Sequence, residues 1–239
     1  MNILLLPLVA AQGMWVRRRV EVLPPASGPT TGSTTGDGGP PLRLMVIGES
    51  TAAGCGADTH EAAFTGAFAC ALAEGCRRRV TWTVRGRRGA TIRRVRHRMC
   101  PELPHNTDVV VLLIGVNDVL NRTPARQWSN DLDAVIAALT ARADLVVVAG
   151  IPPFEDFPSL PRALRKYLTH RGQVLDDVAR RLCATRPGVS WIGSTGLVPA
   201  GDQFFARDGF HPSGAGYQRW AQALSDRLTP TDSKGGMAP

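Results

Sequence analysis

Hydrophobic runs alternate with segments of helical periodicity along most of this chain. Five short apolar runs predict strands, at residues 42–48, 80–84, 109–115, 145–150 and 189–192. Between them, hydrophobic spacings of three and four predict helices, at residues 62–73, 91–99, 161–184, in the stretch that Thr123 caps and Pro124 opens, and in the stretch after Ser213. Strands alternating with such helices predict a parallel sheet covered on both faces. We therefore expect an α/β fold, a three-layer α/β/α sandwich with a mainly parallel five-stranded sheet.

The segments outside this alternating pattern divide the chain into four parts. Residues 1–23 are apolar and then basic, and residues 24–41 are rich in Pro, Gly and Thr and predict a flexible linker. Residues 42–228 form the expected folded domain, and residues 229–239 form a polar tail that we expect to be disordered. The apolar run at 3–11 is about half as long as a membrane span. An interfacial anchor, a misassigned start and a strand packed on the domain all fit it.

Polar residues follow three of the predicted strands. Ser50 comes directly after the first strand, Asn117 follows the third, and Asp208 and His211 share a short segment late in the chain. The carboxyl ends of parallel strands share one edge, where ligands bind. A serine nucleophile, a histidine base, a carboxylate orienting that base and an amide donor are the parts of a serine acyl-transfer site. The sequence therefore predicts such a site at this edge.

Four short motifs occur in an order that resembles the SGNH, or GDSL-type, hydrolase family. They are Gly48-Glu49-Ser50, a lone glycine at Gly89, Gly115-Val116-Asn117-Asp118, and Asp208-Gly209-Phe210-His211. The resemblance covers roughly residues 42–228 and implies the family's flavodoxin-like fold. One departure is plain, because Glu49 stands where the family has aspartate.

The resemblance also implies roles for single residues. Ser50, His211 and Asp208 match the family's catalytic triad, and Ser50, Gly89 and Asn117 match its oxyanion-hole donors. Gly86 is a competitor for the role of Gly89, and Asp202 is a second candidate for orienting His211. Asp118 is expected to bond local backbone groups. The α/β-hydrolase alternative fails, because its Gly-x-Ser-x-Gly elbow is absent around Ser50.

The expected function is that of a serine esterase, which hydrolyses an acyl or acetyl ester through an acyl-enzyme. An O-acyltransferase using the same residues and a catalytically decayed, membrane-tethered binding protein remain open. No cofactor is expected. The five cysteines show no C-x-x-C pair and no zinc spacing, so no metal site is expected either.

Ten arginines between residues 77 and 98 surround Gly89, in a chain with a net charge of +8. They predict either a solvated basic face or attraction to an anionic substrate or lipid surface. No nucleic-acid partner is expected, because only Trp82 interleaves with the arginines. The expected partners are an ester or lipid-like substrate and a membrane surface touched by residues 3–19. A cytoplasmic or peripherally membrane-associated location fits both.

Overall fold

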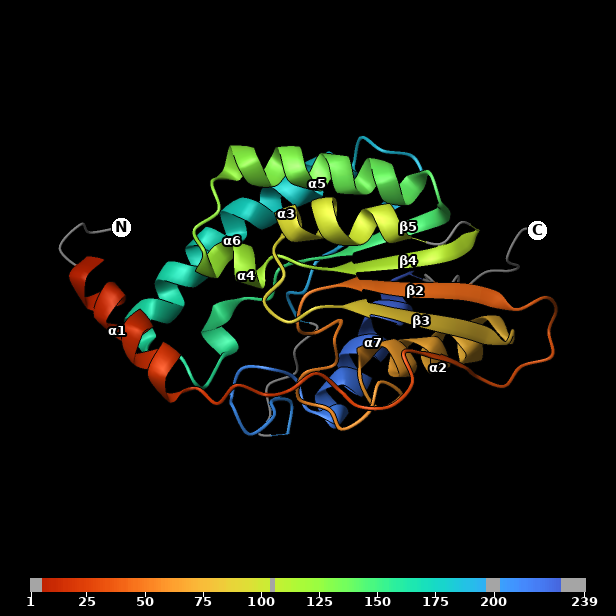
Figure 1. Ribbon diagram of the computed structural model, residues 1–239, viewed down its shortest axis with the longest axis horizontal. Coiled ribbons are helices and arrows are strands. Elements are labelled where there is room, and N and C mark those ends of the chain that lie inside the picture. The colour runs from red at the N-terminus through yellow and green to blue at the C-terminus, as the bar shows by residue number, and fades with distance from the viewer. Residues whose placement is uncertain (1–5, 104–105, 197–202, 229–239) are drawn as a thin grey trace.

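The computed structural model describes residues 6–103, 106–196 and 203–228 as an α/β/α sandwich (Figure 1). Its sheet has six strands in the order β1-β3-β2-β4-β5-β6, of which β1 alone is antiparallel to its neighbour. The strands are β1 (Thr31–Ser33), β2 (Leu42–Gly48), β3 (Val80–Gly86), β4 (Thr107–Leu113), β5 (Ala143–Ala149) and β6 (Val189–Ile192). The expected α/β/α sandwich with a mainly parallel sheet is confirmed, with one strand more than expected.

Helices cover both faces of the sheet (Figure 1). One face carries α3 (Ile92–Arg94), α4 (Val116–Leu120), α5 (Ala125–Thr140) and α6 (Arg162–Cys183), and the other carries α2 (Phe64–Cys76) and α7 (Gly214–Leu228). The chain continues from α3 through a π-helical turn, Val95–Met99, and a 3₁₀ turn, Cys100–Glu102. Successive strand residues feed opposite cores: Met45 packs under α5, whereas Leu44 packs under α2.

The strand β1 corrects the expectation of a flexible linker at residues 24–41. Gly32 pairs with Trp82 of β3, and a Cβ on Gly32 would lie 2.2 Å from the Trp82 ring. A Cβ on Gly36 would lie 2.4 Å from the backbone of Arg78. The lack of a side chain on Gly32 therefore lets β1 approach the Trp82 ring closely. This ring supplies the apolar contact for β1, which has no hydrophobic side chains of its own.

The N-terminal segment forms the helix α1 (Leu6–Arg19), which packs on α6. Val9 of α1 is buried, and Gln12 Oε1 accepts a hydrogen bond of 3.0 Å from the backbone N–H of Leu164, in the first turn of α6. Among the described residues, no helix has the length and apolar character needed to cross a bilayer.

The start of α5 differs from the expectation that Thr123 caps it. The helix begins after Pro124 without a side-chain cap, and the Thr123 hydroxyl donates instead to Asp118 Oδ1 at 2.9 Å. Asp118 also accepts the backbone N–H of Ile92 at 2.9 Å. The buried Asp118 therefore ties α4 to the start of α3, 26 positions earlier in the sequence, whereas only contacts with local backbone groups were expected of it.

Candidate active site

Ser50 stands at the end of β2, where a tight turn leaves the sheet. Gly48 has φ +151°, and a Cβ there would lie 1.8 Å from the carbonyl oxygen of Leu113 on β4. Only glycine fits this close approach between two strands. Ser50 is 8% exposed and is therefore largely shielded from bulk water.

Ser50, His211 and Asp208 form a continuous hydrogen-bonded chain. His211 Nε2 lies 2.9 Å from Ser50 Oγ, and His211 Nδ1 lies 2.6 Å from Asp208 Oδ2. The second oxygen of Asp208 accepts the backbone N–H groups of Phe210 and His211 at 2.9 and 3.0 Å. The structure thus brings together three residues that lie up to 161 positions apart in the sequence.

The charge of Asp208 is supported by its neighbours. Burial disfavours the carboxylate, but the hydrogen bond from His211 and the backbone N–H groups of Phe210 and His211 outweigh it. The pKa of Asp208 consequently lies below its usual value. An ionised Asp208 can hold the proton on His211 Nδ1 and leave Nε2 free to accept one from Ser50.

Glu49, the departure from the family motif, holds Asn117 in place. Its Oε2 accepts both the backbone N–H of Asn117 at 2.9 Å and the side-chain Nδ2 at 2.5 Å, and its Oε1 accepts the Val116 N–H at 3.0 Å. Glu49 is 2% exposed, and burial raises its pKa to about 8 against the opposing effect of these hydrogen bonds. The longer side chain therefore still reaches the start of α4.

Gly89 lies on the loop that follows β3, on the other side of β2 from α4. The backbone N–H of Arg87 donates to the carbonyl of Gly48 at 3.0 Å, which ties this loop to the turn before Ser50. Gly89 has φ +73° and is exposed, with open space where a side chain would point. Gly86 is pressed against the backbone of Ala53, since a Cβ there would lie 2.1 Å away, so packing explains Gly86. Asp202 lies outside the described residues.

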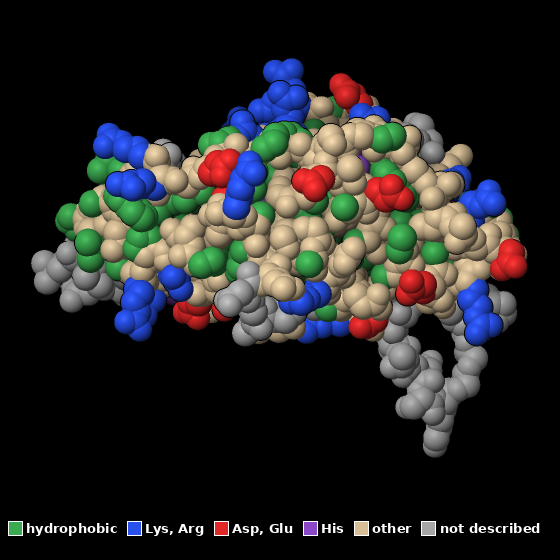
Figure 2. All heavy atoms as spheres, turned by 90° about the horizontal axis from the view of Figure 1, so that it is seen from below, with side chains coloured by type: hydrophobic (Ala, Val, Ile, Leu, Met, Phe, Trp, Pro, Cys, Tyr) green, Lys and Arg blue, Asp and Glu red, His purple; other side chains and the backbone are tan. Residues whose placement is uncertain are grey.

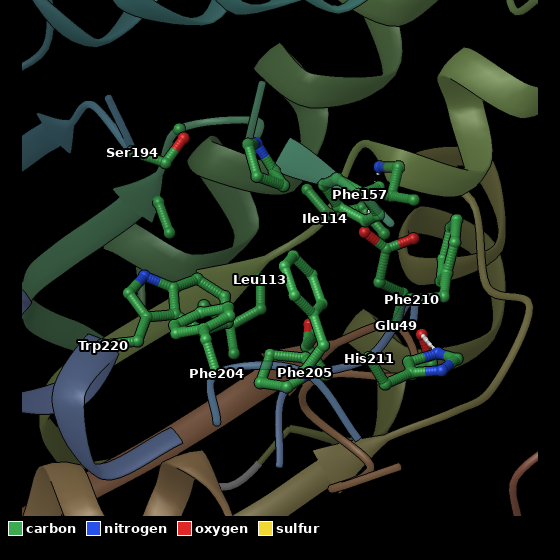
Figure 3. Close-up of a pocket in the computed structure, with 17 residues that line it drawn as sticks. Glu49, Leu113, Ile114, Phe157, Ser194, Phe204, Phe205, Phe210, His211 and Trp220 are labelled. Atoms are coloured by element: carbon green, nitrogen blue, oxygen red, sulfur yellow. Dashed lines mark hydrogen bonds between the residues drawn. The ribbon is translucent and has the colours of Figure 1, made fainter. Parts of the chain in front are cut away.

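A hydrophobic pocket opens beside Ser50 and runs toward α7 (Figure 3). Figure 3 shows His211 at one side of this pocket and Trp220 and Ser194 at the opposite side. Its walls are mainly aromatic and aliphatic, and its volume is about 50 Å³. Its principal lining residues are Leu113, Phe157, Phe204, Phe205, Phe210 and Trp220.

Sequence patterns missed this pocket. The aromatic residues come from four separate segments, so only the fold brings them together. The sequence does show that residues 151–160 are rich in proline and phenylalanine. Phe157 of this loop lines the pocket, and the hydroxyl of Ser159 donates to the Gly209 carbonyl at 2.8 Å.

Comparisons with known proteins agree with this geometry. The model of the GDSL-like lipase/acylhydrolase family matches residues 46–219. A GDSL-like esterase of Mycobacterium tuberculosis is 27% identical over 202 residues, which cover 79% of this chain and 63% of that protein. The chain thus spans less than two thirds of that relative's length.

Solved structures of similar fold include two esterases of different kinds. A family 3 carbohydrate esterase of Clostridium thermocellum superposes with a TM-score of 0.61 at 18% identity, covering 79% of this chain and 99% of that one. Phospholipase A1 of Streptomyces albidoflavus superposes with a TM-score of 0.60 at 18% identity and the same coverage. At this identity the likeness concerns the fold.

Proposed function

Because the chain belongs to the GDSL-like lipase/acylhydrolase family of serine ester hydrolases, we propose that it hydrolyses a carboxylic ester through an acyl-enzyme on Ser50. The observation that carries this proposal is the hydrogen-bonded chain from Ser50 through His211 to Asp208. A free serine hydroxyl is a weak nucleophile, and a base at 2.9 Å activates it. This intact chain favours catalysis over a decayed binding site.

The reaction proceeds in two steps. His211 Nε2 takes the proton of Ser50 while Oγ attacks the ester carbonyl carbon, and His211 then returns that proton to the departing alcohol. Water enters next, loses a proton to His211 and cleaves the acyl-enzyme, so that the acid leaves and Ser50 regains its proton. Asp208 stabilises the imidazolium that forms in each step.

We assign the developing oxyanion to three donors: the backbone N–H groups of Ser50 and Gly89 and the side chain of Asn117. Glu49 takes one N–H of the Asn117 amide at 2.5 Å, which fixes the amide and leaves the other N–H for the oxyanion. Removing one such donor costs about 10² to 10³ in kcat. Asn117→Ala is therefore expected to lower kcat by this factor and leave KM nearly unchanged.

The pocket beside Ser50 suits the acyl part of the ester. A site for one water occupies about 10–15 Å³ by the same measure, so about 50 Å³ holds roughly four non-hydrogen atoms. Its hydrophobic walls favour an aliphatic group. We therefore propose a short acyl group, such as acetyl to butyryl, as the preferred one.

A serine-directed probe tests the proposed function. A fluorophosphonate should label the wild-type protein, and labelling should disappear in Ser50→Ala. A series of p-nitrophenyl esters from acetate to decanoate should then show the highest kcat/KM at the short end. Labelling that persists in Ser50→Ala, or a folded protein that neither labels nor hydrolyses any of these esters, would overturn the proposal.

A further inference from the structure

A basic groove lies on the opposite side of Ser50 from the acyl pocket. It has a volume of about 940 Å³ and begins at the loop that carries Gly89. Arginines dominate its wall, and Glu102 is the one acidic residue among those that line it. The five arginines of the groove are Arg85, Arg87, Arg93, Arg94 and Arg98.

The fold presents these arginines from an anchored segment. In α3 and the π-helical turn after it, Ile92 and Val95 are fully buried, whereas Arg94 and Arg98 are exposed. The backbone of Ile92 is bound to Asp118, the neighbour of Asn117 in α4. The cationic side chains therefore project from a backbone that is fixed to the same helix as a proposed oxyanion donor.

Most of the charge in the groove is uncompensated. Arg85 lies 3.7 Å from Glu102, and Arg96, which lies outside the groove, pairs with Asp131 at 2.8 Å. Within the part of the chain that the structure describes, Arg87, Arg93, Arg94 and Arg98 make no ion pair. Several free guanidinium groups around one hollow suit a ligand with more than one negative charge.

The order of the strands places the groove where a leaving group would lie. Ser50 follows β2, the acyl pocket lies toward β4, β5 and α7, and the groove lies toward β3 on the other side. Ala53, three residues after Ser50, is part of the groove wall, and Gly86 packs directly against it. An ester bound at Ser50 with its acyl group in the pocket can therefore extend its alcohol or thiol toward the groove.

We propose that the basic groove binds the phosphate groups of a phosphorylated alcohol or thiol that leaves Ser50. This inference rests on the proposed function and adds the chemical class of the leaving group. Phosphate oxygens match the planar fork of arginine, and the uncompensated charge attracts such a substrate before it binds. His211 donates its proton to the departing oxygen or sulfur, and the phosphate groups keep their charge throughout.

Two pairs of substrates with identical reacting groups test the proposal and separate two sources of phosphate. In the first pair, 1-butyrylglycerol 3-phosphate is compared with 1-butyrylglycerol. In the second pair, acetyl-coenzyme A is compared with S-acetylpantetheine, which lacks the phosphates. In at least one pair, kcat/KM should be about tenfold or more higher for the phosphorylated member, and this preference should shrink as salt screens the charges. The pair that shows it identifies the source.

Charge reversal tests the groove itself. The double variant Arg94→Glu, Arg98→Glu should lose most of this preference and keep its activity on the unphosphorylated members. The control Arg181→Glu, Arg219→Glu changes the net charge equally on exposed positions of α6 and α7 and should keep the preference. Equal losses in the two variants, or no preference in the wild type for either pair, would overturn the inference.

A binding measurement separates failure of the groove from failure of the proposed function. Calorimetry should show that the wild type and the control bind inorganic pyrophosphate, whereas Arg94→Glu, Arg98→Glu binds at least tenfold more weakly. Equal binding by all three proteins would overturn the inference even if p-nitrophenyl esters are hydrolysed normally. Intact pyrophosphate binding without hydrolysis of any ester would instead count against the proposed esterase.

Discussion

At the scale of single residues, Glu49 links the nucleophile's turn to the proposed oxyanion hole. Its two oxygens accept three N–H groups from Val116 and Asn117 while it stays buried beside Ser50. Aspartate at this position would have to bring the start of α4 closer to β2. We therefore regard Glu49 as a positioning residue, one that acts on the reaction through Asn117.

Protonation of Glu49 should make the stability of the fold depend on pH. Burial raises its pKa from 4.5 to about 8, so the native protein binds a proton more tightly than the unfolded chain. Stability should therefore fall as pH rises from about 4.5 to 8. The free energy of unfolding should fall by up to about 4–5 kcal/mol over this range. Glu49→Gln keeps a neutral side chain at every pH and should abolish this fall. Urea unfolding of both proteins at pH 5 and pH 8.5 measures it, and parallel pH dependence would contradict the prediction.

The same titration should appear in catalysis. Above pH 8 the ionised Glu49 lies next to the site where negative charge develops, so kcat should decline there. In Glu49→Gln this decline should be absent. A purely structural role for Glu49 would change the amount of folded protein and leave the shape of the kcat–pH profile as it is in the wild type.

Ser50 and His211 should act as one unit. Ser50→Ala and His211→Ala should each reduce kcat by several orders of magnitude, and the double variant should be hardly worse than either, because each loss already disables the other residue. Circular dichroism should show the same fold in all three. Independent, multiplying losses would mean that the 2.9 Å contact between them carries no catalytic coupling.

Short motifs predicted the residues that contact each other at the site because the functional residues of each motif lie within a few positions of one another. Asp208 and His211 are three residues apart, so one turn fixes their contact wherever it stands in the fold. The bond between Glu49 and Asn117 joins residues 68 positions apart and depends on the spacing of β2 and β4. No pattern along the chain encodes that distance.

At the scale of elements, α7 sets the depth of the acyl pocket. Trp220 of α7 closes the end of the pocket opposite His211 and packs against Phe64 of α2, with 4.8 Å between ring centroids. Its indole N–H is buried and, among the described residues, has no hydrogen-bond partner. A buried N–H without a partner lowers the stability of the fold by about 1–3 kcal/mol. The shape of the Trp220 ring therefore matters more at this position than its ability to hydrogen-bond.

Trp220→Phe should lengthen the pocket and shift the preferred substrate. We expect the ratio of kcat/KM for p-nitrophenyl hexanoate to that for the acetate to rise severalfold. The lost packing should cost about 1–2 kcal/mol, offset in part because no unpaired N–H remains. Trp82→Phe is the matched control, since Trp82 lies in the same core and does not line the pocket. A ratio that changes equally in both variants would contradict this role of Trp220.

Helices with a strong apolar stripe were predictable, whereas β1 was not. The stripe of α5, from Trp128 to Leu139, is buried as the spacing predicted. The segment that forms β1 contains Thr, Gly and Ser and has no hydrophobic pattern. Its strand arises from hydrogen bonds to β3 and from the Trp82 ring under Gly32, and both belong to a partner distant in sequence.

At the scale of the whole molecule, α1 adds an outward face of mixed hydrophobic and basic character. Leu8, Met14 and Trp15 are 47, 60 and 51% exposed, and the Arg19 guanidinium lies 5.9 Å from the centre of the Trp15 ring. Figure 2 shows hydrophobic and basic side chains together at the left end of the molecule, where α1 lies in Figure 1. This pairing is typical of helices that lie on anionic membrane surfaces.

We therefore expect the protein to bind vesicles containing phosphatidylglycerol and to bind much less to vesicles of phosphatidylcholine alone. Met14→Ser, Trp15→Ser should weaken binding to the anionic vesicles by about tenfold or more, because it removes the exposed hydrophobic contact. Val174→Ser changes an exposed hydrophobic residue on α6 and serves as control. Cosedimentation measures binding, and equal affinity of all three proteins for anionic vesicles would refute a role of α1.

The position of β1 at the edge of the sheet also affects whether copies of the protein aggregate. Because β1 occupies the outer side of β3, the backbone groups there are already paired within the molecule. A variant that begins at residue 42 would lose β1 and expose Val80–Gly86, a strand rich in β-branched and aromatic residues, as a template for intermolecular pairing. It should form concentration-dependent aggregates in light scattering, whereas a variant that begins at residue 24 keeps β1 and should stay dispersed. The three small residues of β1, Thr31–Ser33, would thus prevent self-association by pairing with β3, without large or charged side chains.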